Sequence, residues 1–312
     1  MLLDKYINPL TDFGFKRLFG SEPNKDLLID FLNQVLPERH RISDLTYANN
    51  EQIGDSALDR KAIFDLRCRG ENGEQFIVEL QKVKQKFFKD RSVYYASFPI
   101  RNQAKRGEWD FELQPVYTVG ILDFVFDKEK DPTQYVHTVE LKNQVNQVFY
   151  DKLKFIYIEL PKFTKREAEL ETQFDRWLYV FRYLAKLQHR PAALQDRVFV
   201  KLFETAEIAR MQPEELQVYE DSLKYFRDLK NSFDTAKEEG REEGREEGRE
   251  EGRVEGRAEG RAEGIEEGRR EGKDEGIREA SLKMARKLKA QGISIQVICE
   301  TTGLSETVVK QL

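Results

Sequence analysis

The clearest pattern of apolar and polar positions lies in two short runs, 62–68 and 75–81. Apolar and polar residues alternate along both runs as in half-buried strands, and a glycine-containing turn at 70–73 joins them. Side chains alternate along a strand, so one surface should collect three polar groups, Asp65, Glu79 and Gln81. The opposite face is apolar and carries Phe64, Leu66, Cys68, Phe76, Val78 and Leu80. The pattern predicts a β-hairpin on which two carboxylates and an amide converge.

Asp65 and Glu79 are candidate metal ligands. Carboxylates that lie close together in a buried site are costly without a cation. A cluster made of oxygen donors suits Mg²⁺ or Mn²⁺. The three histidines of the chain share no ligand spacing, so zinc is not indicated.

The remaining periodic segments divide into helices and strands. Helical spacing predicts helices at about 25–35, 87–106, 168–187 and 198–233, and Pro99 should kink or divide the second of them. Residues 115–126 are almost continuously apolar, as a strand buried on both faces is, and should form the central strand of the sheet. Further strands are expected at 42–51, 135–141 and 155–160. We therefore expect an α/β protein.

Two further groups of charged residues allow two interpretations each. Asp12 and Lys16 lie in residues 11–19, which begin a helix or a turn into one. On a helix they would share a face, where an ordinary surface ion pair explains them by composition alone. Arg91 belongs to a basic helix side that either contacts phosphates or is a solvated surface.

The opening Thr-Asp-Phe-Gly-Phe-Lys-Arg-Leu-Phe at 11–19, the Asp on the first strand and the Glu-x-Gln ending the second resemble the PD-(D/E)XK nuclease superfamily. Within it the sequence is most similar to the Rpn group of recombination-promoting nucleases, also described as transposase-like. The resemblance covers about residues 4–230. It implies a restriction-endonuclease-like mixed sheet flanked by helices, and DNA cleavage in recombination. It also implies site roles for Asp65 and Glu79 as metal ligands, Gln81 beside them, Asp12 as a flanking acid and Lys16 as a phosphate-facing cation.

Gln81 stands where the superfamily commonly has a lysine, a variant that the Rpn group also shows. An amide can orient water or a phosphate oxygen, but it is neither a cation nor a strong base at neutral pH. Lys16 or Arg91 can supply the missing positive charge. The expected activity is Mg²⁺- or Mn²⁺-dependent DNA endonuclease cleavage. The alternative is a non-catalytic DNA- or protein-interaction protein that keeps the nuclease fold.

From Gly240 to Gly276 a glycine recurs at every fourth position, ten in all, within Glu-Glu-Gly-Arg repeats. In a helix the Glu–Arg pairs at i,i+3 would each contribute about 0.2–0.5 kcal/mol, whereas each interior glycine costs about 1 kcal/mol relative to alanine. A marginal helix at best is expected. We favour a charged, extended spacer over a homo-oligomerising helical stalk whose copies approach along the glycines.

Residues 281–312 regain amphipathic character. One helix should end at Gly292, Ser294 can cap a second at 295–301, and Gly303 turns the chain into a third. The arrangement resembles a basic helix-turn-helix of net charge +3, but the last helix has barely two turns. A packing or dimerising cap is therefore favoured over a DNA-reading module.

Charge and composition set the remaining bounds. The net charge is −5, with −2 on residues 1–236 and −6 on 237–279, so no strong non-specific grip on DNA is expected. No apolar run approaches the about 20 residues of a membrane span, and Cys68 and Cys299 do not make a disulfide framework. We expect a cytoplasmic protein without membrane contact. Its parts should be a nuclease domain at 1–233, a repeat stalk or linker at 234–280 and a small helical terminus at 281–312.

Overall fold

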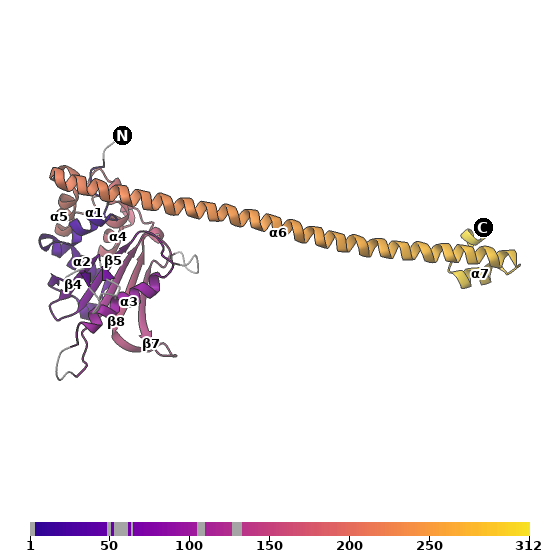
Figure 1. The fold of residues 1–312 in the computed structure, drawn as a ribbon, viewed down its shortest axis with the longest axis horizontal. Helices are drawn as coiled ribbons and strands as arrows, with labels where there is room; N and C mark the ends of the chain where they lie inside the picture. Colours follow the sequence, from indigo (N-terminus) through magenta and orange to yellow (C-terminus); the bar gives the residue numbers. More distant parts are fainter. Residues whose placement is uncertain (1–3, 49–50, 53–61, 64, 105–109, 127–132) are drawn as a thin grey trace. The chain divides into compact units, whose positions relative to one another are not determined.

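The computed structural model describes residues 4–48, 51–52, 62–63, 65–104, 110–126 and 133–312 (Figure 1). Its contacts define two compact units, Met1–Asp234 and Thr235–Leu312. Within the described ranges, no helix combines the length and the apolarity that a membrane crossing requires.

The first unit is built on a six-stranded sheet. Its strands are β1 (Leu45–Tyr47), β4 (Leu66–Gly70), β5 (Gln75–Gln81), β6 (Val116–Leu122), β7 (Val136–Lys142) and β8 (Val148–Glu159). Their order is β1-β4-β5-β6-β8-β7. β5, β6 and β8 are parallel, whereas β4 pairs antiparallel with both β1 and β5, and β7 pairs antiparallel with β8. The predicted mixed sheet is therefore confirmed.

Among the described residues of this unit, six α-helices begin. They are α1 (Asp12–Phe19), α2 (Lys25–Val35), α3 (Phe88–Arg101), α4 (Gln173–Tyr183), α5 (Arg197–Ala206) and α6 (Pro213–Ala290). Short 3₁₀ turns occur at Glu22–Asn24, Glu38–His40, Leu160–Lys162, Glu167–Glu169, Leu184–Lys186 and Ile208–Arg210.

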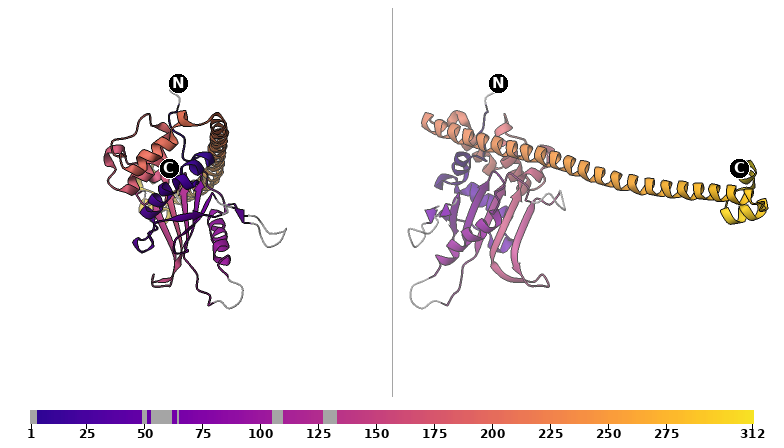
Figure 2. Two further views of the ribbon diagram at one scale, coloured as in Figure 1. Left: turned by 90° about the vertical axis from the view of Figure 1, so that its left-hand side faces the viewer. Right: turned by 45° about the vertical axis from the view of Figure 1, so that its right-hand side comes forward.

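Alternation along β5 sends its side chains to two differently covered faces of the sheet. Phe76, Val78 and Leu80 enter the main hydrophobic core, to which α1, α2, α4 and α5 also contribute. Ile77 packs against Phe98 of α3 on the opposite face. In Figure 2 α3 lies on its own side of the sheet, apart from α1 and α2. The α3 face is therefore the one that receives the alternate, odd-numbered positions of β5.

Aromatic side chains fill the centre of the main core. Phe19 of α1 stacks on Phe181 of α4 with 5.5 Å between ring centroids, and Phe31 of α2 meets Phe181 edge-on at 5.1 Å. Trp177 is fully buried and donates from Nε1 to Asp30 at 2.6 Å. Aromatic pairs of this kind contribute about 0.5–1.5 kcal/mol beyond the area they bury. This packing fixes α1 in the core and with it the position of the opening motif.

The strand predictions are confirmed for β5, β6 and β7, and the strand expected at 155–160 is the second half of the longer β8. The segments 42–51 and 62–68 need correction. All seven residues of β6 are buried and both of its neighbours are parallel, as the continuous apolar run predicts. The segment 42–51 forms β1 and the separate short strand β2 (Glu51–Gln52), which pairs with β3 (Ala62–Ile63). The first run of the hairpin is thus shared between β3 and β4, with Asp65 in a bend before β4. Phe64 lies outside the described residues.

Two helix predictions were wrong in detail. α3 continues through Pro99 to Arg101 and is not divided, because a proline in the last turn removes little of the helical hydrogen bonding. The segment 198–233 is not one helix, since α5 ends at Ala206 and α6 begins only at Pro213. Proline has the fixed φ angle that suits a first helical position, so it marks a start there.

The repeat is helical throughout in the second unit, so the charged helical stalk expected in the fold is confirmed and the extended spacer that we favoured is wrong. α6 covers 78 residues, and its glycines leave open space where a Cβ would stand. One i,i+3 pair, Arg253 with Glu250 at 2.7 Å, shows the support that the repeat spacing gives. Helix formation is limited by its nucleus, and α6 starts in packed turns that hold Tyr219 and Phe226 buried. The repeat therefore extends a helix that is already formed.

The small helical terminus is confirmed. α7 (Ile295–Thr302) and α8 (Glu306–Gln311) pack on the end of α6 around Ala285, Ile298 and Val309, all fully buried. Gly303 ends α7 in the left-handed region at φ 71°, where glycine is favoured. Lys289 donates to the carbonyl oxygens of Val309 and Lys310 at 3.1 and 3.0 Å, which satisfies the end of α8. Whether this terminus reads DNA stays a prediction.

Candidate active site

Glu79 and Gln81 lie at the carboxyl end of β5 on the α3 face. Each is 7% exposed, so the alternation that places them opposite Phe76, Val78 and Leu80 also buries them. Gln81 donates from Nε2 to Oε2 of Glu79 at 3.5 Å. The neighbouring strand β6 pairs with them through Gly120 and Leu122. The amide and the carboxylate therefore form one polar group on an otherwise packed surface.

Asp65 joins this group from the bend before β4. Its Oδ2 accepts a 2.6 Å hydrogen bond from the backbone N–H of Leu80, which ties the bend to β5 between Glu79 and Gln81. Burial raises the pKa of Asp65, and the Leu80 N–H opposes that shift. The structure thus brings together the three residues that the hairpin pattern predicts would converge.

Glu79 lies in surroundings that disfavour its charged form. Its Oε1 is buried and has no hydrogen-bond partner among the described residues. Burial and then the nearby charge of Asp65 raise the pKa of Glu79 to about 8, while Arg91, the Asp65 backbone and Gln81 lower it less. A carboxyl group with such a pKa holds its proton at neutral pH unless a cation lies beside it.

Asp12 and Lys16 lie next to this group on α1. Thr11 caps the helix by accepting from the N–H of Gly14 at 3.0 Å, and Lys16 Nζ lies 3.0 Å from Oδ1 of Asp12. Both side chains are about half exposed. Asp12 raises and Lys16 lowers the pKa of Asp65, so both are electrostatic neighbours of that carboxylate. They are an i,i+4 surface pair that also borders the site.

Arg91 reaches the site from the first half of α3. Its Nη1 donates to Oε1 of Gln85 at 2.5 Å, and its guanidinium lies 5.4 Å from the ring centroid of Tyr95. Its charge lowers the pKa of Glu79. Arg91 is therefore the cation on the Glu79 side of the site, and Lys16 is a cation on the Asp65 side.

Comparison with protein families explains this collection of residues. The family model described as PD-(D/E)XK nuclease family transposase matches residues 9–236. The chain belongs to this family. The match covers the opening motif, the hairpin with Asp65, Glu79 and Gln81, and the whole sheet of the nuclease fold. Searches of curated proteins and of solved structures gave no match.

Nucleases of this family generally act with divalent metal ions, and the oxygen donors of the site fit one. The unpartnered Oε1 of Glu79 and the raised pKa values of both carboxyls are what a cation would relieve. The described part of the chain holds no cluster of three or more His, Cys, Asp or Glu side chains able to bind a metal. An ion here would therefore take Asp65 and Glu79 and fill its other positions from an amide, the backbone or water, as Mg²⁺ commonly does.

Lys82 is a site neighbour that the sequence analysis missed. Burial lowers the pKa of its ammonium group, whereas Asp12 and Asp65 raise it, so the lysine lies within electrostatic reach of both acids. Its Nζ is 5.6 Å from the ring centroid of Tyr225 on α6. Strict alternation would place Lys82 on the opposite face from Gln81, but β5 ends at Gln81 and frees the next residue from that rule. The sequence signal that could have indicated Lys82 is its position directly after the Glu-x-Gln motif.

Proposed function

We propose that this chain is a DNA endonuclease that depends on Mg²⁺, with Mn²⁺ able to replace it, and that it breaks DNA in recombination. The observation that carries the proposal is the buried Oε1 of Glu79, which has no hydrogen-bond partner in the described part of the chain and lies beside a second carboxylate. Burying an uncompensated acid is costly, and such costs cluster at functional sites.

Asp65 and Glu79 would hold the metal ion. When bound, a divalent ion offers charge that stabilises a pentacovalent phosphate and lowers the pKa of a water molecule. The hydrogen bond from Leu80 holds the Asp65 carboxylate against β5, next to the strand position of Glu79. Gln81 hydrogen-bonds Glu79 and offers its remaining donor and acceptor atoms to a water molecule or a phosphate oxygen.

Three basic residues surround the carboxylates and suit the phosphate of DNA. Lys16 and Lys82 act on Asp65, and Arg91 acts on Glu79. Fixed positive charges beside a phosphate that gains negative charge lower the barrier to its hydrolysis. In this proposal they replace the lysine that the superfamily commonly has at the position of Gln81.

A plasmid-nicking assay with Mg²⁺ titrated from zero tests the proposal. We expect nicks or linear DNA from the wild-type chain and none from Asp65→Ala. Glu112→Gln is the matched acidic control, because Glu112 is 67% exposed and precedes β6 at the opposite end of the strand from Leu122. Equal cleavage by wild type and Asp65→Ala, or none by the wild type with Mg²⁺ and with Mn²⁺, would leave the non-catalytic interaction protein as the function.

A further inference from the structure

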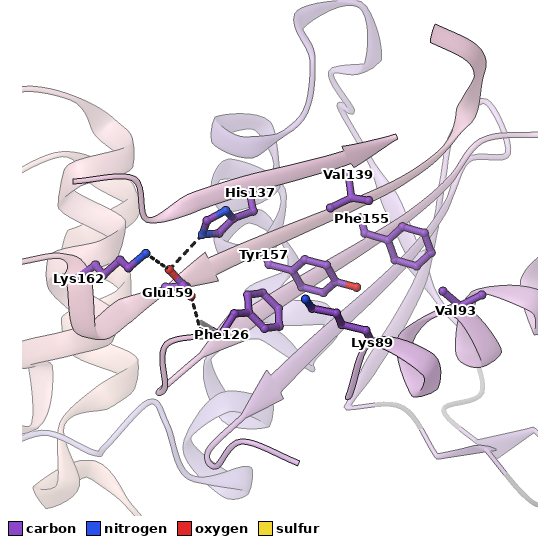
Figure 3. A pocket seen from close by; sticks show the side chains of 9 residues that line it. All are labelled: Lys89, Val93, Phe126, His137, Val139, Phe155, Tyr157, Glu159 and Lys162. Atoms are coloured by element: carbon purple, nitrogen blue, oxygen red, sulfur yellow. Dashed lines mark hydrogen bonds and ion pairs between the residues drawn. The ribbon is translucent and has the colours of Figure 1, made fainter. Parts of the chain in front are cut away.

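A second concave site lies on the same side of the sheet, between α3 and the strands β7 and β8 (Figure 3). It encloses about 390 Å³. The residues that line it are Lys89, Val93, Phe126, His137, Val139, Phe155, Tyr157, Glu159 and Lys162. The volume is within the range of small-ligand sites. None of these residues was assigned a role in the catalytic group.

The walls of this pocket are apolar and aromatic. Phe155 and Tyr157 lie nearly parallel on β8 with 6.2 Å between ring centroids, and Phe126 meets Tyr157 edge-on at 5.1 Å. Val93 on α3 and Val139 on β7 are 59% and 48% exposed, so apolar surface faces solvent on both sides. Flat rings beside exposed aliphatic groups favour a planar, partly apolar ligand.

One end of the pocket is polar and fully engaged. Glu159 is 1% exposed, and its Oε1 accepts from the N–H of Phe126 at 2.6 Å. Its Oε2 lies 3.0 Å from Nε2 of His137 and 2.6 Å from Nζ of Lys162. The carboxylate and the ammonium cancel in charge, so this end of the pocket is polar but carries no net charge from that pair. Such an end suits the polar edge of a nucleobase better than a simple anion.

The strand register connects this pocket to the catalytic group. Glu79 of β5 pairs with Gly120 of β6, and Gly120 pairs with Tyr157 of β8. Adjacent strands are about 4.8 Å apart, so the backbones at Glu79 and Tyr157 are about 10 Å apart. A Cβ on Gly120 would come within 2.8 Å of the Tyr157 ring, so the glycine lets that ring lie over β6 on the catalytic side. A single DNA strand needs only a few nucleotides to cover this separation, so one strand can reach both sites.

A basic and aromatic segment runs from one site to the other. It comprises residues 82–91, Lys-Val-Lys-Gln-Lys-Phe-Phe-Lys-Asp-Arg, which begin at the end of β5 and enter α3. Lys82 and Arg91 border the catalytic carboxylates, and Lys89 lines the pocket. Between them Phe87 is 64% exposed, with the Lys86 ammonium 5.5 Å from its ring centroid. Interleaved cations and exposed rings are typical of surfaces that bind single-stranded DNA.

We propose that the pocket receives an unstacked nucleobase of the DNA strand whose phosphate lies at the catalytic carboxylates. The inference rests on the proposed function and deepens it, because it names the substrate class as single-stranded or locally unpaired DNA. A base inside a duplex cannot enter such a pocket, so a paired target must first give up stacking and pairing at that nucleotide. Residues 82–91 guide the backbone past the start of α3 while the base turns into the pocket.

The test fills the pocket with tryptophan from either wall. Val139→Trp on β7 and Val93→Trp on α3 are compared with Val145→Trp, whose valine is 64% exposed in the β7–β8 connection and outside the pocket. All three are made in the full chain with Asp65→Asn, so that DNA is bound without being cut. Affinity for a labelled single-stranded oligonucleotide is measured by fluorescence anisotropy with Mg²⁺. One abasic nucleotide is moved through every position of the oligonucleotide.

In the Asp65→Asn parent, whose pocket is unchanged, we expect an abasic nucleotide at one position to weaken binding about tenfold. This is the loss expected when one stacked base is removed. Val139→Trp and Val93→Trp should each weaken binding of the intact strand about tenfold and become insensitive to that abasic position. Val145→Trp should behave as the parent does. The inference would be overturned if the affinity losses from the tryptophan substitution and from the abasic nucleotide multiplied as independent effects. It would also be overturned if no abasic position weakened binding. Competition by a free deoxynucleoside monophosphate as strong as by the oligonucleotide would overturn it too, since the pocket would then serve free nucleotides.

The proposed nuclease activity is scored separately, with Asp65 intact. Plasmid nicking by the wild type together with an absent abasic effect removes the base pocket and leaves the nuclease. Absent nicking under all metals removes the nuclease whatever the oligonucleotides show.

Discussion

Two buried glutamates lie near the carboxyl ends of β5 and β8, the parallel strands on either side of β6, and on the same face of the sheet, yet their surroundings differ. Glu159 of β8 is 1% exposed and Glu79 of β5 is 7% exposed. Glu159 receives the Phe126 N–H, the His137 ring and the Lys162 ammonium. Burial acts against it, but these three donors outweigh burial and lower its pKa. For Glu79 burial and Asp65 dominate and raise the pKa to about 8.

The difference distinguishes a carboxylate whose charge the protein itself stabilises, Glu159, from one whose charge it leaves uncompensated, Glu79. We call the second kind poised. The protein supplies Glu159 with enough donors to keep it ionised without any ligand, so this carboxylate fixes the positions of β7, β8 and the 3₁₀ turn at Leu160–Lys162. It leaves Oε1 of Glu79 without a hydrogen-bond partner within the described residues. Burial alone therefore does not distinguish the two glutamates. The missing compensation does.

The largest expected effect is on DNA cleavage, and it tests Glu79 together with its neighbour Asp65. Glu79→Gln and Asp65→Asn should each lower the nicking rate about 10³-fold, because each removes a negative charge that would hold the metal ion beside the reacting phosphate. The rates are measured from single-turnover cleavage of supercoiled DNA at saturating Mg²⁺. Nicking by Glu79→Gln at the wild-type rate would show that its uncompensated carboxylate has no catalytic use.

For the free energy of unfolding we expect the reverse: substitution of Glu159 should matter more than substitution of Glu79. Glu159→Gln leaves the Lys162 ammonium without its charge partner and should lower the free energy of unfolding by about 3 kcal/mol, or about 6–12 °C in Tm. Glu79→Gln removes an unfavourable charge and should leave stability unchanged or raise it in EDTA. Tryptophan fluorescence reports on the first unit, because both tryptophans precede residue 234.

Glu169→Gln is the control for that measurement. Glu169 is paired with Arg166 at 3.2 Å but is 47% exposed, so its loss should cost much less stability than the loss of Glu159. A Glu159→Gln chain as stable as the Glu169→Gln chain would mean that the three donors do not hold the sheet edge.

The pH dependence of stability distinguishes the two glutamates more finely. A pKa of about 8 in the folded state, against the usual 4.5, means that the folded chain keeps a proton that the unfolded chain has released. Stability should therefore fall as pH rises from about 5 to 8, by up to about 1.4 kcal/mol per pH unit for one group. Glu159, with its lowered pKa, contributes stability above its usual pKa and loses it in acid.

Glu79→Gln should flatten the fall between pH 5 and 8, measured by chemical denaturation in EDTA. Part of the slope should remain, because the pKa of Asp65 is also raised. An unchanged slope in Glu79→Gln would place the responsible proton on another group.

The sequence predicted the β-hairpin of the candidate site because the information for it is local. A period of two along 75–81 is enough to put Glu79 and Gln81 opposite Phe76, Val78 and Leu80, and the structure confirms that division. The compensation of Glu159 depends on contacts between residues 22 positions apart and on a turn, so no periodicity indicates it. His137 accordingly had no expected role.

For the repeat, by contrast, local reasoning favoured an extended spacer where the structure has a helix. Ten glycines at about 1 kcal/mol each outweigh the i,i+3 ion pairs, so propensity argued against a helix. That sum omits the start of α6, where Tyr219 and Phe226 are buried and the helix is already nucleated. Lys82 was missed for a related reason, since the end of β5 depends on pairing with β6 and not on β5 itself.

The smallest expected effect concerns Gln81, which hydrogen-bonds the poised glutamate and occupies the position where the superfamily commonly has lysine. Gln81→Lys would place an ammonium beside Glu79, in effect giving that acid a partner of the kind that Glu159 already has. We expect the cleavage rate at saturating Mg²⁺ to change less than about threefold, because Lys16 and Lys82 already act on Asp65 and Arg91 on Glu79.

The same substitution should raise the Mg²⁺ concentration needed for half-maximal rate, since a cation at this position competes with the metal for the carboxylates. Gln81→Asn, which keeps the amide and shortens it, is the control for lost geometry. A Gln81→Lys chain several-fold faster than wild type at equal Mg²⁺ would contradict the prediction. It would show that the three neighbouring cations do not replace the missing lysine. It would also show that leaving Glu79 without a charge partner slows cleavage.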